Sequence, residues 1–225
     1  MDVKRLVILV EGDSELKLMN GLVIPELYKR LSIKPHSSEW SLEACKIVTN
    51  RQLNKKGGNV NYEYLKNDVK RFSAQGCAVI TTFLDFFRLP VTFPGYTTDG
   101  SLIGQVEQAM EKDLRSSIPN LPRFIPYIQK YEYEALLFAD IVGFEYLLDE
   151  QTELEAIKKI MEQYPNPEDI NGGNTTAPSK RLSNIFNYNK TSDSNEVLTM
   201  IGFDTIYGKC PRFKEWFDKL EDEIL

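Results

Sequence analysis

The sequence contains only one histidine among 225 residues, and its three cysteines stand far apart. Cys45, Cys77 and Cys210 are odd in number and show no CxxC spacing, so we expect buried thiols in a reducing compartment. His36 lies in the polar stretch KPHSSEW, which argues against catalysis by a histidine base. A structural zinc site is not expected either, because there is no second histidine.

Long hydrophobic runs are also missing, and no stretch approaches the length needed to cross a bilayer. The N-terminal sequence MDVKRLVILV has a short apolar run without a small-residue cleavage site, so we expect no signal peptide. An excess of positive charge is lacking too, since the net charge is −6 and the pI is near 5.1. We therefore expect a cytoplasmic protein with no membrane segment, which does not bind nucleic acid by charge alone.

Apolar residues make up 42% of the chain, and they follow strand-like and helix-like patterns in turn. This alternation predicts an α/β fold with a mainly parallel central sheet, helices on both faces and a helical C-terminal region. We expect an α/β core over residues 1–150 and a mainly helical extension over 151–225 packed on the same domain. Pro25 should kink or split the first helix. The expected strands are 5–10, 45–50, 77–87 and 123–134, and the expected helices are 14–31, 62–75, 101–115, 134–148, 151–164 and most of 181–225.

Acidic residues follow three of the expected strands. Glu11 and Glu15 come after the first strand, and Asp85 ends the stretch CAVITTFLD within the strand expected at 77–87. Glu132 and Glu134 are two residues apart, which on a strand places both carboxylates on one face. In an open α/β sheet, ligands bind beyond the carboxyl ends of the strands. Such acids suit Mg²⁺ or Mn²⁺, and the chemistry they support is phosphoryl transfer or phosphodiester cleavage.

Each acid also has a structural interpretation. Asp13, within the same cluster, is expected to cap the helix that follows. Glu15 is equally compatible with a solvated position in the first helical turn, where the helix dipole favours an anion. Asp85 is compatible with a simple turn, and Glu132 and Glu134 with an exposed strand face.

A basic segment precedes the C-terminal helices. Pro178 suits the start of a helix, which would place Ser179, Lys180 and Arg181 in its first turn. Backbone N–H groups and two cations would there face an anion, although a solvated basic turn explains the segment equally well. Arg88, close to Asp85, is a candidate either to position that acid or to contact a phosphate.

Four segments together resemble a known family: VEGDSE, TTFLDFFRLPVTFPG, FIPYIQKYEYEALLF and NGGNTTAPSKR. They resemble a family of small, uncharacterised bacterial Toprim-like proteins, a domain of unknown function related to Toprim nucleases of the OLD (overcoming-lysogenisation-defect) type. The segments lie between positions 10 and 181 and occur in the family's order. The resemblance implies a compact sheet with helices on both faces and magnesium-dependent chemistry on nucleic acid.

The resemblance also implies roles for individual residues. Glu11 would be the principal catalytic acid and a metal ligand, Glu15 the second glutamate, Asp85 the acid at the end of a central strand, Glu132 and Glu134 the acid-x-glutamate pair, and Lys180 the transition-state cation. The chain departs from the family pattern in two places. Phe86 and Phe87 follow Asp85, so the usual DxD is absent, and Tyr131 stands where the family often has histidine.

These observations predict a Mg²⁺- or Mn²⁺-dependent Toprim-type nuclease. Its metal ligands would be Glu11, Glu15, Asp85, Glu132 and Glu134. Relatives often accompany an ABC-type or OLD-like ATPase, so the resemblance implies such a partner, which would hold the nucleic acid, and a role in anti-phage defence. Two alternatives stay open: a non-catalytic subunit that regulates the ATPase, and a nucleotide phosphotransferase or phosphatase whose loop 86–96 closes over a base. The sequence leaves the substrate and the oligomeric state open.

Overall fold

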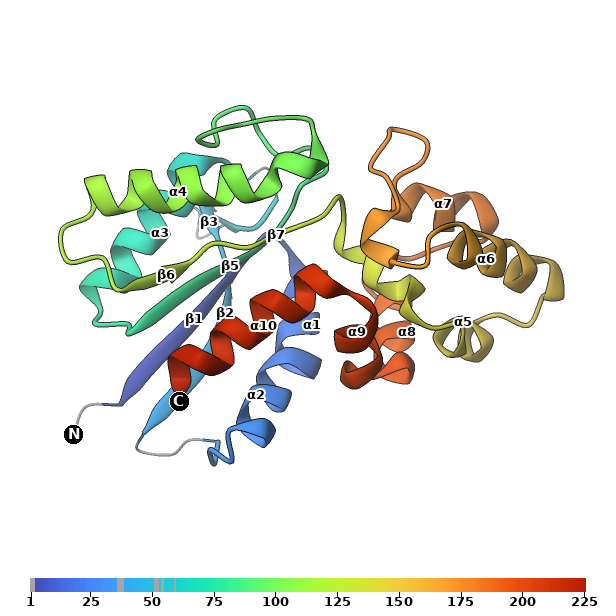
Figure 1. The fold of residues 1–225 in the computed structure, drawn as a ribbon, viewed down its shortest axis with the longest axis horizontal. Coiled ribbons are helices and arrows are strands. Elements are labelled where there is room, and N and C mark those ends of the chain that lie inside the picture. Colours follow the sequence, from blue (N-terminus) through green and yellow to red (C-terminus); the bar gives the residue numbers. More distant parts are fainter. Residues whose placement is uncertain (1–2, 36–38, 51–52, 54, 59) are drawn as a thin grey trace. The chain divides into compact units, whose positions relative to one another are not determined.

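The computed structural model describes residues 3–35, 39–50, 53, 55–58 and 60–225, so His36 lies outside the described residues. The chain forms two compact units (Figure 1). The first unit contains Met1–Leu84, Arg88–Ile128 and Lys219–Leu225, and the second contains Asp85–Phe87 and Gln129–Asp218. The chain therefore enters the second unit briefly after its central strand and again at Gln129.

A five-stranded sheet forms the centre of the first unit. Its main order is β2-β1-β5-β6, and these neighbours are parallel. Leu6 to Val10 of β1 are fully buried, as expected for a strand that is covered on both faces. The prediction of a parallel α/β sheet is thus confirmed. The strands of this sheet are β1 (Lys4–Val10), β2 (Trp40–Lys46), β5 (Val79–Asp85), β6 (Arg123–Ile125) and β7 (Ile128–Gln129), which pairs with β5.

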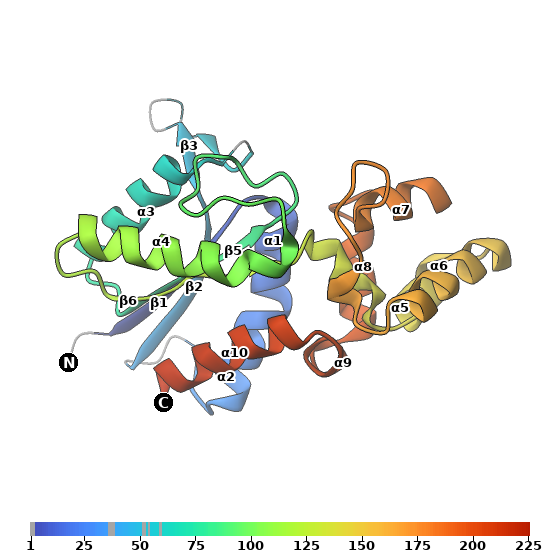
Figure 2. The same cartoon turned by 45° about the horizontal axis from the view of Figure 1, so that its top comes forward.

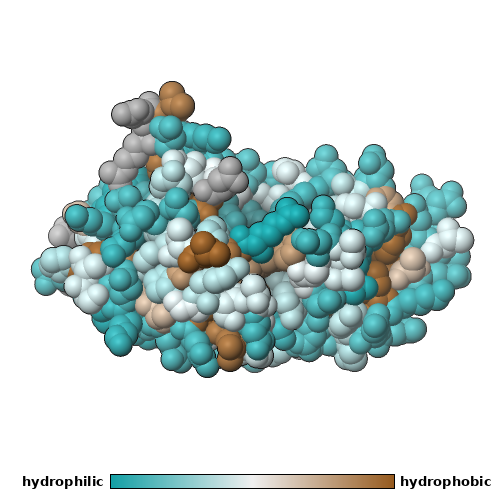
Figure 3. Space-filling model, turned by 90° about the horizontal axis from the view of Figure 1, so that it is seen from above, coloured by the Kyte–Doolittle hydropathy of each residue, from teal (hydrophilic) through white to brown (hydrophobic). Residues whose placement is uncertain are grey.

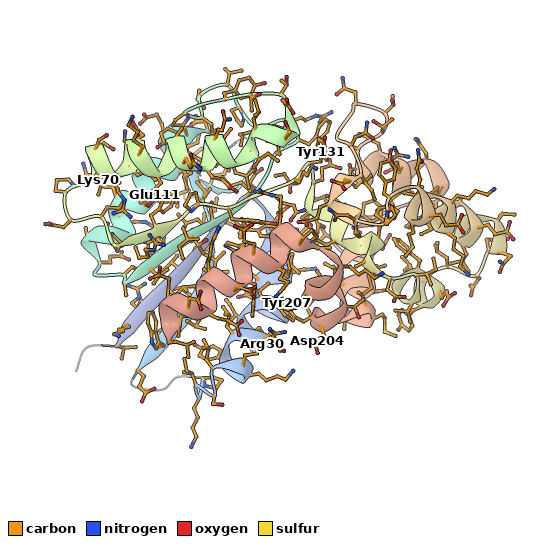
Figure 4. The ribbon with its side chains drawn as sticks, in the orientation of Figure 1. Arg30, Lys70, Glu111, Tyr131, Asp204 and Tyr207 are labelled. Carbon is orange, nitrogen blue, oxygen red and sulfur yellow. The ribbon has the colours of Figure 1, made fainter. Side chains whose placement is uncertain are left out.

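Helices cover both faces of this sheet (Figures 1 and 2). One face carries α3 (Tyr62–Ala74) and α4 (Ile103–Ser117), and the other carries α1 (Asp13–Leu18), α2 (Ile24–Arg30) and the last turns of α10 (Pro211–Ile224). Arg30, labelled in Figure 4, pairs with Glu26 of its own helix at 2.9 Å and lies 3.8 Å from Glu221 of α10. These ion pairs join the end of α10 to α2.

The first predicted helix is split, as the proline implied. A π-helical segment, Met19–Val23, separates α1 from α2. Pro25 stands in the first turn of α2, where its missing N–H costs no hydrogen bond. The wider π turn immediately before it is where the regular hydrogen-bond ladder is interrupted.

The second strand differs from the prediction for residues 45–50. It begins at Trp40, ends at Lys46 and pairs with β1 along its length, while β3 (Val48–Asn50) forms an antiparallel hairpin with β4 (Lys55–Lys56). The predicted extent was wrong because this is an edge strand of the sheet. Buried Trp40 and Leu42 alternate with partly exposed residues, which gives a weaker signal than a continuous apolar run.

A 3-10 helix, η3 (Tyr133–Ala139), lies at the centre of the second unit, and all seven of its side chains are buried. The last strand before it, β7, ends at Gln129, and η3 begins at Tyr133, so the prediction of a strand up to residue 134 was wrong. Side chains that are buried all round the segment, Glu134 among them, need cover on every side, and helices from later in the chain contact it. They are α5 (Val142–Leu147), α6 (Gln151–Gln163), η4 (Pro167–Asp169), α7 (Pro178–Ile185), α8 (Asp193–Ile201) and α9 (Phe203–Lys209).

The surface is mostly hydrophilic on the face shown in Figure 3, with isolated hydrophobic residues. Exposed large apolar side chains include Val91 in the first unit and Tyr146 in the second. Single exposed residues of this kind are normal on folded proteins. Of the helices in the described part of the chain, none has both the length and the apolarity needed to cross a membrane.

Candidate acidic site

The turn after β1 contains the first group of predicted acids. Gly12 is the N-cap residue of α1 in extended conformation, and no side chain caps this helix. The prediction that Asp13 caps the helix was therefore wrong. Asp13 is the first helical residue, and its Oδ1 lies 2.6 Å from Nζ of Lys46 at the end of β2. The ammonium on the neighbouring strand draws the carboxylate away from the backbone N–H groups of α1.

Glu15 is only 4% exposed, so the interpretation as a solvated first-turn residue was wrong. Its side chain folds back over the turn, because its Oε2 lies 2.8 Å from the place where a Cβ on residue 12 would stand. Glycine at position 12 therefore makes room for the Glu15 carboxylate. Glu11 is half-buried, and its carbonyl oxygen accepts a hydrogen bond from the N–H of Gly58 at 3.3 Å.

The β3–β4 hairpin holds the backbone of Glu11. Gly57 has a positive φ of 74°, and a Cβ at this position would stand 2.5 Å from the carbonyl oxygen of Glu11. The N–H of Gly57 also donates to the carbonyl of Ile47 at 2.7 Å. In the sequence this stretch is basic and contains glycines, but no local pattern connects it with Glu11. Its paired glycines were the available signal for a close backbone approach.

Asp85 and Glu134 lie together in the second unit, on either side of the ammonium group of Lys190. Nζ of Lys190 is 3.2 Å from Oε1 of Glu134 and 3.8 Å from Oδ2 of Asp85. The other oxygen of Asp85 accepts a hydrogen bond from the N–H of Tyr133 at 2.8 Å, which places the acid beside η3. The second unit thus brings two of the predicted acids onto a cation that the sequence analysis did not identify.

Glu134 is fully buried. Burial raises the pKa of its carboxyl group to about 7, with the Lys190 ammonium acting in the opposite direction and the Glu132 carboxylate adding to the rise. Its Oε1 accepts no hydrogen bond from any described residue, although the Lys190 ammonium lies close to it. The ionised form of Glu134 is stabilised by the Lys190 ammonium and by a backbone hydrogen bond within the residue, and a buried carboxylate of this kind favours an additional positive charge.

Glu132 makes different contacts from Glu134. Its Oε2 accepts from the backbone N–H of Ser179, and its Oε1 accepts from the hydroxyl of Ser179, both at 2.9 Å. Because β7 ends at Gln129 and Glu134 lies in η3, the two glutamates do not share a strand face. At the anion site predicted in the first turn of α7, the bound anion is the carboxylate of Glu132. Lys180, the next residue after Ser179, is exposed.

Phe87 stands where the second acid of a DxD motif would be, and it packs with Tyr131 around Gly172. A Cβ on residue 172 would lie 2.8 Å from Cδ1 of Tyr131 and 3.1 Å from Cδ2 of Phe87. Tyr131, labelled in Figure 4, has a left-handed backbone with φ of 63°, which is uncommon for a bulky residue. This aromatic contact takes the place of an acidic side chain next to Asp85.

The predicted site residues therefore fall into separate groups. Glu11 and Glu15 belong to the first unit, whereas Asp85, Glu132, Glu134 and Lys180 belong to the second. Carboxylate oxygens are the ligands that Mg²⁺ and Mn²⁺ prefer, and the Asp85–Glu134 pair fits this donor chemistry. Within the described ranges, no group of three or more His, Cys, Asp or Glu side chains is arranged to hold a metal ion.

Lys190 was missed because nothing in the sequence connects it to Glu134, which is 56 positions away. It lies in the turn before α8, a segment that the sequence showed only as part of a mostly helical tail. Its carbonyl oxygen accepts from the hydroxyls of Tyr133 and Ser194, which fixes the backbone from which the side chain reaches the acids.

Comparisons with known proteins agree with this architecture. A protein-family model described as a domain of unknown function, DUF4276, matches residues 10–221. No curated protein matches the chain. Among solved structures, the C-terminal region of the Burkholderia pseudomallei OLD protein is similar, with a TM-score of 0.51, 15% sequence identity and 99% of each chain covered. At this identity the similarity concerns the fold.

Proposed function

The chain belongs to the DUF4276 family, and from its OLD-related fold and its acidic residues we propose that it is a metal-dependent Toprim-type nuclease subunit. The proposed reaction is hydrolysis of a phosphodiester bond. The proposed partner is an ABC-type or OLD-like ATPase that holds the nucleic acid, because the chain itself carries a net charge of −6 and has little electrostatic attraction for phosphate. A role in anti-phage defence is part of the same proposal and follows from the family resemblance.

One observation carries this proposal: the fully buried carboxylate of Glu134 beside Asp85. Burial of an ionised group is costly unless it is paired or binds a metal, and here one oxygen of Glu134 accepts no hydrogen bond from the described residues. Asp85 faces the same ammonium group with its Oδ2. Two carboxylates that share a partly exposed lysine are suited to bind a divalent cation.

In the proposed reaction, Asp85 and Glu134 would hold Mg²⁺ or Mn²⁺, and Glu11 and Glu15 are the proposed acid ligands of the first unit. A bound divalent ion supplies a nucleophilic water and neutralises charge on the phosphate. Glu132 acts through α7, because its contacts with Ser179 set the first turn of the helix that carries Lys180. Lys180 is exposed and would stabilise negative charge that develops on the phosphate.

The proposal is tested by titration of the chain with Mn²⁺ in a calorimeter and by nicking of supercoiled plasmid DNA in the presence of Mn²⁺ and the partner ATPase. We expect Glu134→Gln to lower the cleavage rate by at least about a hundredfold, because removal of one charge-stabilising group typically costs this much. The matched control is Glu155→Gln, an exposed glutamate of α6, which should leave the rate unchanged. Equal cleavage by wild type and Glu134→Gln would contradict the proposal.

A non-catalytic subunit that regulates the ATPase is the second candidate. It is favoured by Phe87, which stands in place of the second acid of the DxD motif, and by the contact of Lys190 with both acids. The calorimetric titration separates the two functions. A regulatory subunit would bind no Mn²⁺ at millimolar concentration, whereas the nuclease subunit would bind it and lose this binding in Glu134→Gln.

A further inference from the structure

The turn between α7 and α8 presents a lysine to two buried acids, and its backbone is firmly held. The side chain of Asn189 accepts hydrogen bonds from the N–H groups of Thr191 and Ser192 at 3.0 and 3.1 Å. The carbonyl of Lys190 accepts from the hydroxyls of Tyr133 and Ser194. The backbone of Lys190 is therefore fixed relative to η3, although its side chain is 44% exposed.

The distances from the ammonium group to the oxygens of Glu134 and Asp85 are long for ion pairs. Nζ lies 3.2 and 3.5 Å from the two oxygens of Glu134 and 3.8 Å from Asp85. Charge-assisted hydrogen bonds between nitrogen and carboxylate are usually about 2.7–2.9 Å. The ring of Tyr133 supports the same ammonium from 4.5 Å, a weak attraction at a partly exposed site. Lys190 thus neutralises the two acids without binding either of them closely.

The acids, in contrast, have little freedom to leave. Glu134 is fully buried on η3, and its Oε1 accepts no hydrogen bond among the described residues. The side chain of Asp85 is 12% exposed and is tethered through Oδ1 to the N–H of Tyr133. Because Asp85 and Glu134 are held in place and the Lys190 side chain is partly exposed, another cation could replace the Lys190 ammonium beside the two carboxylates.

We propose that Lys190 is a displaceable internal counter-ion that competes with a divalent metal ion for the Asp85–Glu134 pair. In the metal-free protein the ammonium stabilises the two carboxylates. When Mg²⁺ or Mn²⁺ binds them, the side chain swings out into solvent, towards which almost half of it already faces. Lys190 thereby lowers the affinity for metal and stabilises the site when metal is scarce. This inference rests on the proposed function, since it assumes that these acids bind a divalent ion.

The test compares Lys190→Met with Lys130→Met. Methionine keeps the apolar stem of the lysine and removes the charge. Lys130 is a matched control in the same unit, because its ammonium also pairs with a carboxylate, Asp169 at 2.6 Å, and lies 5.8 Å from the centre of a tyrosine ring. Both variants change the net charge equally. Loss of the Lys190 ammonium raises the pKa of Glu134 further, because the ammonium lowers it in the wild type. Binding of Mn²⁺ is therefore measured by calorimetry at increasing pH, until the affinity of each variant no longer changes and protons no longer compete.

We expect Lys190→Met to bind Mn²⁺ on the order of tenfold more tightly than wild type, a coupling of ordinary size between two competing ligands, and Lys130→Met to bind as wild type. Thermal unfolding gives a second readout. Lys190→Met should have a lower melting temperature than wild type in EDTA, and Mn²⁺ should raise its melting temperature more. Lys190→Arg, which keeps the charge and serves if the methionine variant fails to fold, should retain the wild-type affinity.

The role of Lys190 and the existence of the metal site are contradicted by different experimental results. Affinity for Mn²⁺ that is unchanged or weaker in Lys190→Met, with binding still lost in Glu134→Gln, would overturn the role of Lys190 and leave the metal site standing. A markedly tighter Lys190→Arg protein would also overturn it. Absence of Mn²⁺ binding in every variant, wild type included, would overturn the metal site of the proposed function and this inference with it.

Discussion

Both carboxylate oxygens of Glu132 are hydrogen-bonded by Ser179, one through the backbone N–H and one through the hydroxyl, each at 2.9 Å. Pro178 precedes this serine as the first residue of α7. A carboxylate at a helix N-terminus satisfies N–H groups that have no partner within the helix and interacts favourably with its dipole. The pair therefore attaches α7, and Lys180 with it, to the segment that leads into η3.

Replacement of Ser179 by alanine should destabilise the second unit. The variant loses the hydroxyl bond to a charged acceptor, which is worth about 1.5–3 kcal/mol, and keeps the backbone bond. We expect the free energy of unfolding, measured in urea, to fall by that amount. Ser183→Ala removes a hydroxyl from the exposed side of the same helix, and its effect should stay within about 0.5 kcal/mol. In a double-mutant cycle, Ser179→Ala and Glu132→Gln should couple; additive effects would contradict a direct contact.

Two adjacent glycines of the β3–β4 hairpin should respond differently to alanine. Gly57 and Gly58 both have positive φ, of 74° and 64°, so each variant incurs a backbone cost of about 1–2 kcal/mol. At Gly57 the new Cβ would stand 2.5 Å from the carbonyl oxygen of Glu11, whereas at Gly58 no atom of the described residues lies within 4 Å of it.

We therefore expect Gly57→Ala to lower the free energy of unfolding by roughly 1–3 kcal/mol more than Gly58→Ala, because the hairpin or the Glu11 turn has to shift. Denaturant unfolding of both variants measures the difference. If Glu11 is a metal ligand, Gly57→Ala should also weaken Mn²⁺-dependent cleavage more than Gly58→Ala does. Equal unfolding free energies for the two variants would show that the hairpin does not press on Glu11.

Glu168 should give the second unit a pH-dependent stability. Its carboxylate accepts from the N–H groups of Arg212 and Phe213 at 2.7 and 3.1 Å, where α10 begins. Burial raises the pKa of this carboxyl group above its ordinary value, although the hydrogen bonds act in the opposite direction. The folded protein thus holds the proton more tightly than the unfolded chain does.

As the pH rises from the ordinary glutamate range to the raised pKa, the unfolded chain loses this proton first. The contribution of Glu168 to the free energy of unfolding therefore falls over that interval, by at most about 1.4 kcal/mol per pH unit for one proton. Urea unfolding at several pH values should show this slope in wild type and in the control Glu162→Gln, an exposed residue of α6. Glu134, whose pKa is also raised, adds a slope of the same sign, so Glu168→Gln should reduce the slope without removing it. An identical slope in wild type and Glu168→Gln would show that Glu168 contributes none of it.

Several elements were predictable because local chemistry dictates them. The continuous apolar run of β1 requires cover on both faces, and the parallel sheet supplies it. Pro25 cannot donate a backbone hydrogen bond, and the first helix is divided just before it. The positions of Glu11 and Asp85 at the ends of β1 and β5 also follow from strand length alone.

Other features depend on partners that local patterns do not reveal. Asp13 has the right residue type and position for a helix cap, but Lys46 of the neighbouring strand binds it instead. Glu132 and Glu134 have the spacing of a strand face, but the apolar residues from Tyr133 onward are buried on all sides as a 3-10 helix. In each case a tertiary contact is stronger than the local preference.

The sequence by itself determined the fold class and the acids at the strand ends, because hydrophobic periodicity and proline geometry act over a few neighbouring residues. Only the tertiary structure decided which charges meet. Lys190 contacts Glu134 across 56 positions, and Ser179 contacts Glu132 across 47. Such pairs form because folding buries carboxylates, and a buried charge has to be satisfied by whichever donor the packing of distant helices brings to it.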